Sequence, residues 1–79
     1  MLLNMLESVV YMRKHMSADE LIKYAENLTA EIQKFERRYK AEPSDKVNYE
    51  QARHFRKLRA KVISVLEQKG VFRGWEVVV

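Results

Sequence analysis

The residue types that could perform acid–base, nucleophilic or metal chemistry are few in this chain. The two histidines, His15 and His54, belong to no recognisable catalytic or metal-binding motif. Ser17 is better explained as a helix cap than as a nucleophile. The only glycines are Gly70 and Gly74, so the chain contains no glycine-rich phosphate loop. We therefore expect a protein that is not an enzyme, with no catalytic residues, no cofactor and no metal site.

Composition excludes several further classes of protein. The 79 residues include no cysteine, which rules out a disulfide-built scaffold and thiolate metal sites. No apolar run approaches the length of a membrane span. The apolar clusters of residues 1–16 are interrupted by Glu7 and lack the basic start and cleavage site of a signal peptide. We expect one small domain, residues 1–79, that is cytoplasmic (or in an organellar matrix) and has no membrane partner.

Basic residues are concentrated in the middle of the chain. Overall, 15 Lys and Arg against 11 Asp and Glu give a net charge of +4. Residues 34–61 hold ten basic and four acidic residues and so carry +6, whereas residues 1–33 carry −2 and residues 62–79 carry zero. Positive charge gathered in one stretch favours a polyanionic partner.

Helical periodicity places part of this charge on one face. On a wheel of about 100° per residue, four basic side chains lie opposite the apolar stripe of the second long helix, with Arg56 beside them. Four more basic residues crowd the end of the helix before it: Lys34, Arg37, Arg38 and Lys40. Such a surface can contact the phosphates of a nucleic acid. The alternative is a solvated face that keeps a small protein soluble. The candidate nucleic-acid-binding residues are Lys46, Arg53, Arg56, Lys57, Lys61, Arg37 and Arg38.

Two long amphipathic helices must position these side chains. Ser17 precedes Glu20 by three residues, which is a capping box and predicts a helix over about 18–41 that stops before Pro43. A second helix is predicted over about 46–69, capped by Ser44 or Asp45 and ended by Gly70. Helices of matched length joined by a short turn pack antiparallel, so we expect Phe35 and Phe55 to be buried on facing stripes.

The two ends of the chain have a different character. Apolar residues at helical spacing predict a short helix over about 2–14, whereas Val71–Val79 is β-prone and is expected to be an extended tail. The fold class is therefore all-α: an antiparallel two-helix hairpin with a short N-terminal third helix. Either end could instead dock on another protein. The candidate partner-binding residues are Leu2, Leu3, Leu6, Val9, Val10 and Trp75.

At these residues the chain resembles a known family, the universal large-subunit ribosomal protein number twenty-nine. The capping segment Ser17–Leu21 reads Ser-Ala-Asp-Glu-Leu and follows Arg13 and Lys14. The segment Arg53–Leu66 is a basic run leading into Val-Ile-Ser-Val-Leu, at a separation close to that of the family. The resemblance covers about residues 13–69. It implies a two-helix hairpin and a place at the large-subunit surface near the nascent-chain exit. It also implies ribosomal RNA contact by Arg53, Arg56, Lys57 and Lys61.

Three functional hypotheses remain open from the sequence. The first is a non-enzymatic structural component that contacts structured RNA, as the ribosomal resemblance implies. The second is a protein–protein interaction adaptor or chaperone, of phage or secretion-system type, that forms a homo-oligomer through its apolar stripes. The third is a DNA-binding regulator, which is disfavoured because both long helices exceed the size of a helix-turn-helix recognition unit.

Overall fold

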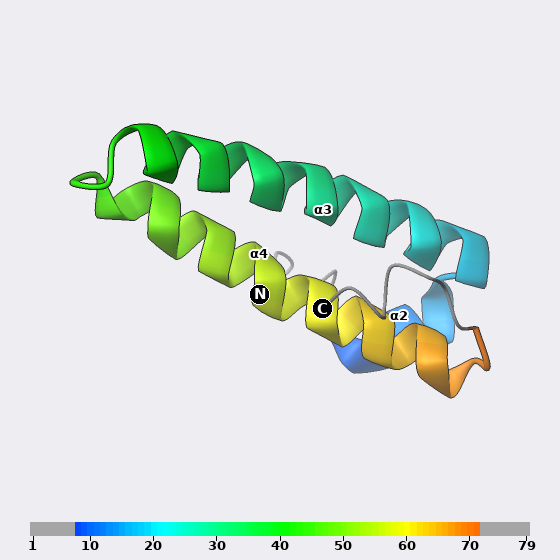
Figure 1. Cartoon of the computed structure of the whole chain (residues 1–79). Coiled ribbons are helices and arrows are strands. Elements are labelled where there is room, and N and C mark those ends of the chain that lie inside the picture. The colour runs from blue at the N-terminus through cyan, green and yellow to red at the C-terminus, as the bar shows by residue number, and fades with distance from the viewer. Residues whose placement is uncertain (1–7, 72–79) are drawn as a thin grey trace.

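The computed structural model describes residues 8–71, and this part of the chain consists of three helices with no strand. These are α2 (Val9–His15), α3 (Ala18–Ala41) and α4 (Lys46–Gln68). The two long helices lie side by side, joined by a short loop, and α2 lies beside the far end of α4 (Figure 1). The all-α prediction is confirmed for residues 8–71. The predicted extended tail lies outside them, except for the non-helical Val71.

Helix α3 begins and ends where its capping residues require. The Ser17 hydroxyl accepts a hydrogen bond from the Glu20 amide (3.1 Å), and the Glu20 carboxylate accepts one from the Ser17 amide (2.8 Å). This reciprocal pair confirms the predicted capping box, which satisfies two backbone amides that the helix leaves without partners. The helix ends at Ala41, with Glu42 as its C-cap, because Pro43 disfavours helical geometry in the preceding residue.

Helix α4 is also capped at both ends by local sequence. The Asp45 side chain accepts from the Val47 amide at 3.1 Å and starts the helix. At the other end Gly70 has a φ of +78°, a left-handed conformation that costs glycine little. The amide of Gly70 bonds to the Glu67 carbonyl, and that of Val71 to the Leu66 carbonyl (2.9 Å). These two bonds form a Schellman motif that ends the helix.

Helix α2 is shorter than the helix predicted over 2–14, and that prediction is wrong at Ser8. Ser8 has extended backbone (φ −79°, ψ 128°), and its hydroxyl accepts from the Tyr11 amide at 3.3 Å, so it caps a new helix that begins at Val9. Residues 1–7 lie outside the described part of the chain. The apolar residues on either side of Ser8 keep helical spacing, so the sequence pattern alone does not indicate a helix start at this serine.

The apolar core lies at the end of the molecule where all three helices meet. Leu21, Ala25 and Leu28 of α3 pack with apolar residues of α4, and Met12 of α2 is fully buried among them. The α4 residues of this core are Leu58, Val62, Val65 and Leu66. Two polar contacts also hold α2 against α4: Arg13 donates to the Gln68 side chain at 3.0 Å, and Lys69 donates to the Arg13 carbonyl at 3.2 Å.

Towards the connecting loop, only α3 and α4 remain and aromatic pairs join them. The Phe35 and Phe55 rings stack with centroids 5.8 Å apart, and the Tyr39 and Tyr49 rings lie 5.5 Å apart. Phe35 and Phe55 face each other as predicted, but they are half-buried rather than buried, and no other helix of residues 8–71 covers them. Later residues of α3 therefore pair with earlier residues of α4.

None of the helices in residues 8–71 combines the length and the apolar character needed to cross a membrane.

Candidate nucleic-acid interface

Four basic side chains follow the face of α4 that points away from α3. The core positions of α4, such as Leu58 and Val62, define its inner face, and helical periodicity puts the four cations on the opposite side. All four are exposed. They extend over about 22 Å of helix at 1.5 Å per residue. We call this set the basic row; its members are Lys46, Arg53, Lys57 and Lys61.

The side chains of the basic row have no polar partner within residues 8–71. The ion pairs of this part of the chain join other residues, and Glu50, which lies on the same face, forms none with Arg53. An unpaired exposed cation keeps its full charge available to a partner, whereas an ion pair partly neutralises it. The cations of the basic row therefore form no ion pair within residues 8–71, although Glu50 lies among them.

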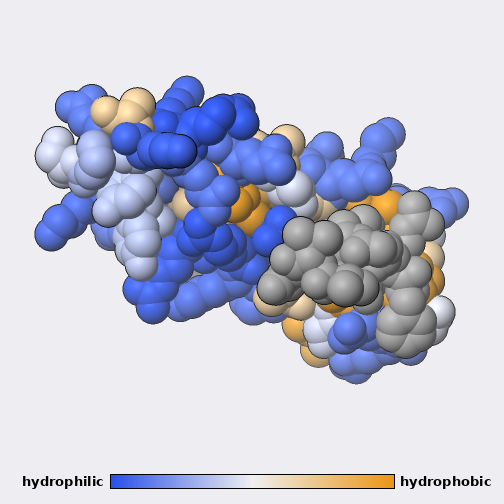
Figure 2. Space-filling view, viewed as in Figure 1, coloured by the Kyte–Doolittle hydropathy of each residue, from blue (hydrophilic) through white to orange (hydrophobic). Residues whose placement is uncertain are grey.

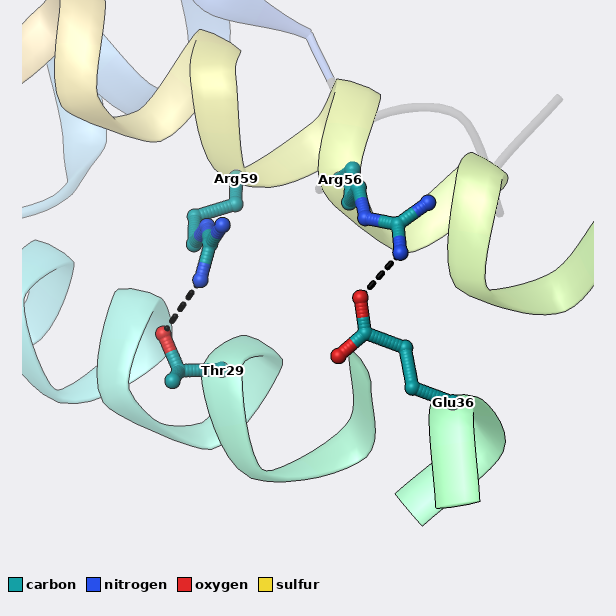
Figure 3. A network of polar contacts seen from close by, with 4 residues as sticks. All are labelled: Thr29, Glu36, Arg56 and Arg59. Atoms are coloured by element: carbon teal, nitrogen blue, oxygen red, sulfur yellow. Dashed lines mark hydrogen bonds and ion pairs between the residues drawn. The ribbon is translucent and has the colours of Figure 1, made fainter. Parts of the chain in front are cut away.

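Arg56 and Arg59 differ from the basic row because both reach across to α3. Arg56 forms an ion pair with Glu36, and the Arg59 guanidinium donates to the Thr29 hydroxyl at 3.0 Å (Figure 3). Arg56 was predicted to contact nucleic acid together with the basic row. The structure places its guanidinium against a carboxylate of the facing helix instead. Both arginines therefore join the two long helices.

Arg37 and Arg38 lie on α3, apart from the basic row. Both are exposed, and the Arg38 guanidinium carbon is 5.5 Å from the centroid of the Phe35 ring, within cation–π range. The buried stripes of α3 and α4 face each other, so their outer sides point in opposite directions. Helical periodicity puts Arg37 on the outer side of α3. The structure therefore brings Lys46, Arg53, Lys57 and Lys61 together, but not Arg37 with them.

The candidate partner-binding residues are divided by the structure. Val9 packs against the core, whereas Val10 is 51% exposed. Leu2, Leu3, Leu6 and Trp75 lie outside the described residues. The space-filling view shows a largely hydrophilic surface along the two long helices, with apolar side chains reaching the surface between them (Figure 2).

The histidines and carboxylates of the described residues form no cluster that could hold a metal ion. The His15 ring lies 4.8 Å from the Tyr11 ring, and the His54 ring lies 5.5 Å from the Phe55 ring, centroid to centroid. Both histidines therefore pack against aromatic neighbours on their own helices.

Comparison with models of known protein families, with curated proteins and with solved structures found no match to this chain.

Proposed function

We propose that this chain is a non-enzymatic RNA-binding protein, an antiparallel helical hairpin that presents the basic row to the phosphates of structured RNA. The observation that carries the proposal is the exposure of four cations on one helix face, none of which forms an ion pair within residues 8–71. Phosphate contacts of this kind position a protein on RNA without reading its sequence. Little base preference is therefore expected on duplex RNA.

The contacts within α3 and α4 hold the basic row on a rigid support. Helix caps fix both ends of α3 and α4, and the cross-helix contacts of Arg56 and Arg59 hold the two helices together. Cations on a rigid helix lose less conformational freedom on binding than cations on a loop. The resemblance of residues 13–69 to large-subunit ribosomal protein number twenty-nine supports the same class of partner, and on that basis the partner would be ribosomal RNA.

Charge reversal in the basic row tests the proposal. Arg53→Glu combined with Lys57→Glu lowers the net charge from +4 to 0, since each change removes two units. Both side chains point away from the core, so the fold is expected to be retained, as helical circular dichroism would show. Binding to an RNA duplex, measured by fluorescence anisotropy at about 50 mM salt, should be lost.

A matched control separates the site from the overall charge. Lys14→Glu combined with Lys23→Glu causes the same change in net charge at exposed positions of α2 and α3. This control should retain most of the affinity. If both double variants lose affinity equally, net charge alone attracts RNA and the basic row is not the binding surface. If the wild-type protein does not bind RNA at low salt, the proposed function is wrong.

The second candidate function is a protein–protein adaptor, and the exposure of Val10 favours it. Val10 is 51% exposed on the short helix α2, where it could contact another protein. In that case Val10→Glu would abolish partner binding, while the double reversal of Arg53 and Lys57 would be nearly silent. Pull-down of a partner by the wild-type protein and by both variants distinguishes the two functions.

A further inference from the structure

An exposed aromatic ring lies beside the basic row, at its edge nearest to α3. Tyr49 follows Lys46 by three residues and precedes Arg53 by four, and residues at these spacings are neighbours on a helix surface. The tyrosine is 47% exposed, one of the few large apolar side chains at the surface of residues 8–71. Cations interleaved with an exposed aromatic ring are typical of surfaces that bind single-stranded nucleic acid.

The Tyr49 ring is held in place from its inner side. It packs against the Tyr39 ring of α3, with centroids 5.5 Å apart and planes inclined at 49°. A ring fixed in this way loses little rotamer freedom when a ligand contacts its exposed part. Tyr49 is therefore better suited to binding than a freely rotating surface tyrosine.

The positive charges that flank Tyr49 indicate which class of ligand would bind at this ring. The exposed cations nearest to Tyr49 along α4 are Lys46 and Arg53, and Glu50 is the exposed carboxylate next to it. A polyanion that also offers aromatic faces matches both the cations and the exposed ring, and single-stranded RNA has this chemistry.

We propose that Tyr49 stacks on an unpaired base of single-stranded RNA while Lys46 and Arg53 contact the phosphates on either side of it. This inference rests on the proposed RNA-binding function and refines it. The basic row alone would bind duplex RNA, whereas stacking on Tyr49 requires a base released from pairing. The protein should therefore prefer single-stranded segments, such as loops, to the same sequence in a duplex.

The test compares a short mixed-sequence RNA alone with the same RNA annealed to its complement, in anisotropy titrations of the full chain. The wild-type protein should bind the single strand more tightly. Tyr49→Leu, which keeps an apolar side chain but removes the ring, should weaken single-strand binding by about 5- to 100-fold. Its duplex affinity should be unchanged. Tyr49→Phe should retain the preference, because the stacking face remains.

Val47→Ala is the matched control, since Val47 is 61% exposed at the same end of α4 but lies off the basic row. It should not change the affinity for either RNA. A measurement on the wild-type protein avoids any effect of substitution on folding. The NMR ring-proton resonances of Tyr49, assigned with the Tyr49→Phe variant, should move upfield with the single strand but not with the duplex.

The outcomes separate the inference from the function on which it rests. Equal affinity for both RNAs, or ring resonances that do not move with the single strand, would overturn the stacking role and leave duplex binding by the basic row intact. Loss of self-association in Tyr49→Leu, seen by sedimentation equilibrium, would instead identify the ring as a contact between copies. Absence of binding to either RNA would end both proposals.

Discussion

Arg59 and Thr29, thirty residues apart in sequence, are joined by a hydrogen bond of 3.0 Å that links α4 to α3. The Thr29 hydroxyl in turn donates to the Ala25 carbonyl of its own helix at 3.0 Å. The hydroxyl therefore accepts a hydrogen bond from α4 (Figure 3) while it donates one within α3. Both of its hydrogen-bonding roles are used, so the contact is sensitive to any change in the register of the two helices.

Replacement of Thr29 by valine tests this contact. Valine keeps the shape of the side chain but leaves the partly buried Arg59 guanidinium without its acceptor. The free energy of unfolding should fall by about 1 kcal/mol. Urea denaturation measures the change, and Thr29→Ser, which keeps the hydroxyl, should lose less. An unchanged midpoint for Thr29→Val would show that the hydrogen bond does not contribute to stability.

The capping box of α3 gives a second prediction. Ser17→Ala removes the acceptor of the Glu20 amide and should cost about 1 kcal/mol. For a domain of this size that corresponds to about 4–8 °C in the thermal midpoint. Ser17→Asp, which can still cap the helix, should stay close to the wild-type midpoint. If Ser17→Ala and Ser17→Asp melt at the same temperature, the cap has no energetic role.

A third prediction concerns the two ends of the core. Leu66 is fully buried where three helices meet, so Leu66→Ala should cost about 2–5 kcal/mol. Phe55→Ala should cost less, about 1–2 kcal/mol, because the ring is only partly buried, where α3 and α4 alone pack within residues 8–71. Chemical denaturation of both variants provides the comparison. A larger loss for Phe55→Ala would contradict this account of the core.

Local sequence predicted the long helices well because their boundaries depend on neighbouring residues. The Ser17–Glu20 pair, Pro43 and Gly70 each act within a few positions of a helix end, and the structure has α3 and α4 at nearly the predicted bounds. The partial burial of Phe55 could not be predicted in this way. It depends on how far α2 extends along the long helices, which is a tertiary property.

The candidate site was predictable only in part, for the same reason. A helical wheel places Arg53 and Lys57 on the outer face of α4, since the wheel needs only the helix itself. It cannot show that Arg56 meets Glu36, twenty positions earlier, because that contact depends on the register between two helices. The role of Met12 as the fully buried residue of α2 was also missed. Its spacing from Val9 and Met16 (three and four residues) was the available signal.

The pairing of Arg56 leads to a fourth prediction, on binding. Arg56→Gln should weaken RNA affinity less than Arg53→Gln, because the charge of Arg56 is already engaged by Glu36. The stability cost should also be small, about 0.2–1 kcal/mol, as for other exposed ion pairs. Anisotropy titrations of the two single variants against the same RNA duplex test the order. The reverse order would mean that Arg56 leaves Glu36 to contact RNA.

The most direct test of the central claim is the salt dependence of duplex RNA binding. If Lys46, Arg53, Lys57 and Lys61 each contact a phosphate, the logarithm of affinity should fall with the logarithm of salt concentration with a slope of about −3 to −4. Arg53→Gln combined with Lys57→Gln removes two of the four phosphate contacts, so the slope should fall to about half of its wild-type value. A slope near zero, or one that the double variant leaves unchanged, would contradict the assignment of the basic row as the RNA-binding surface.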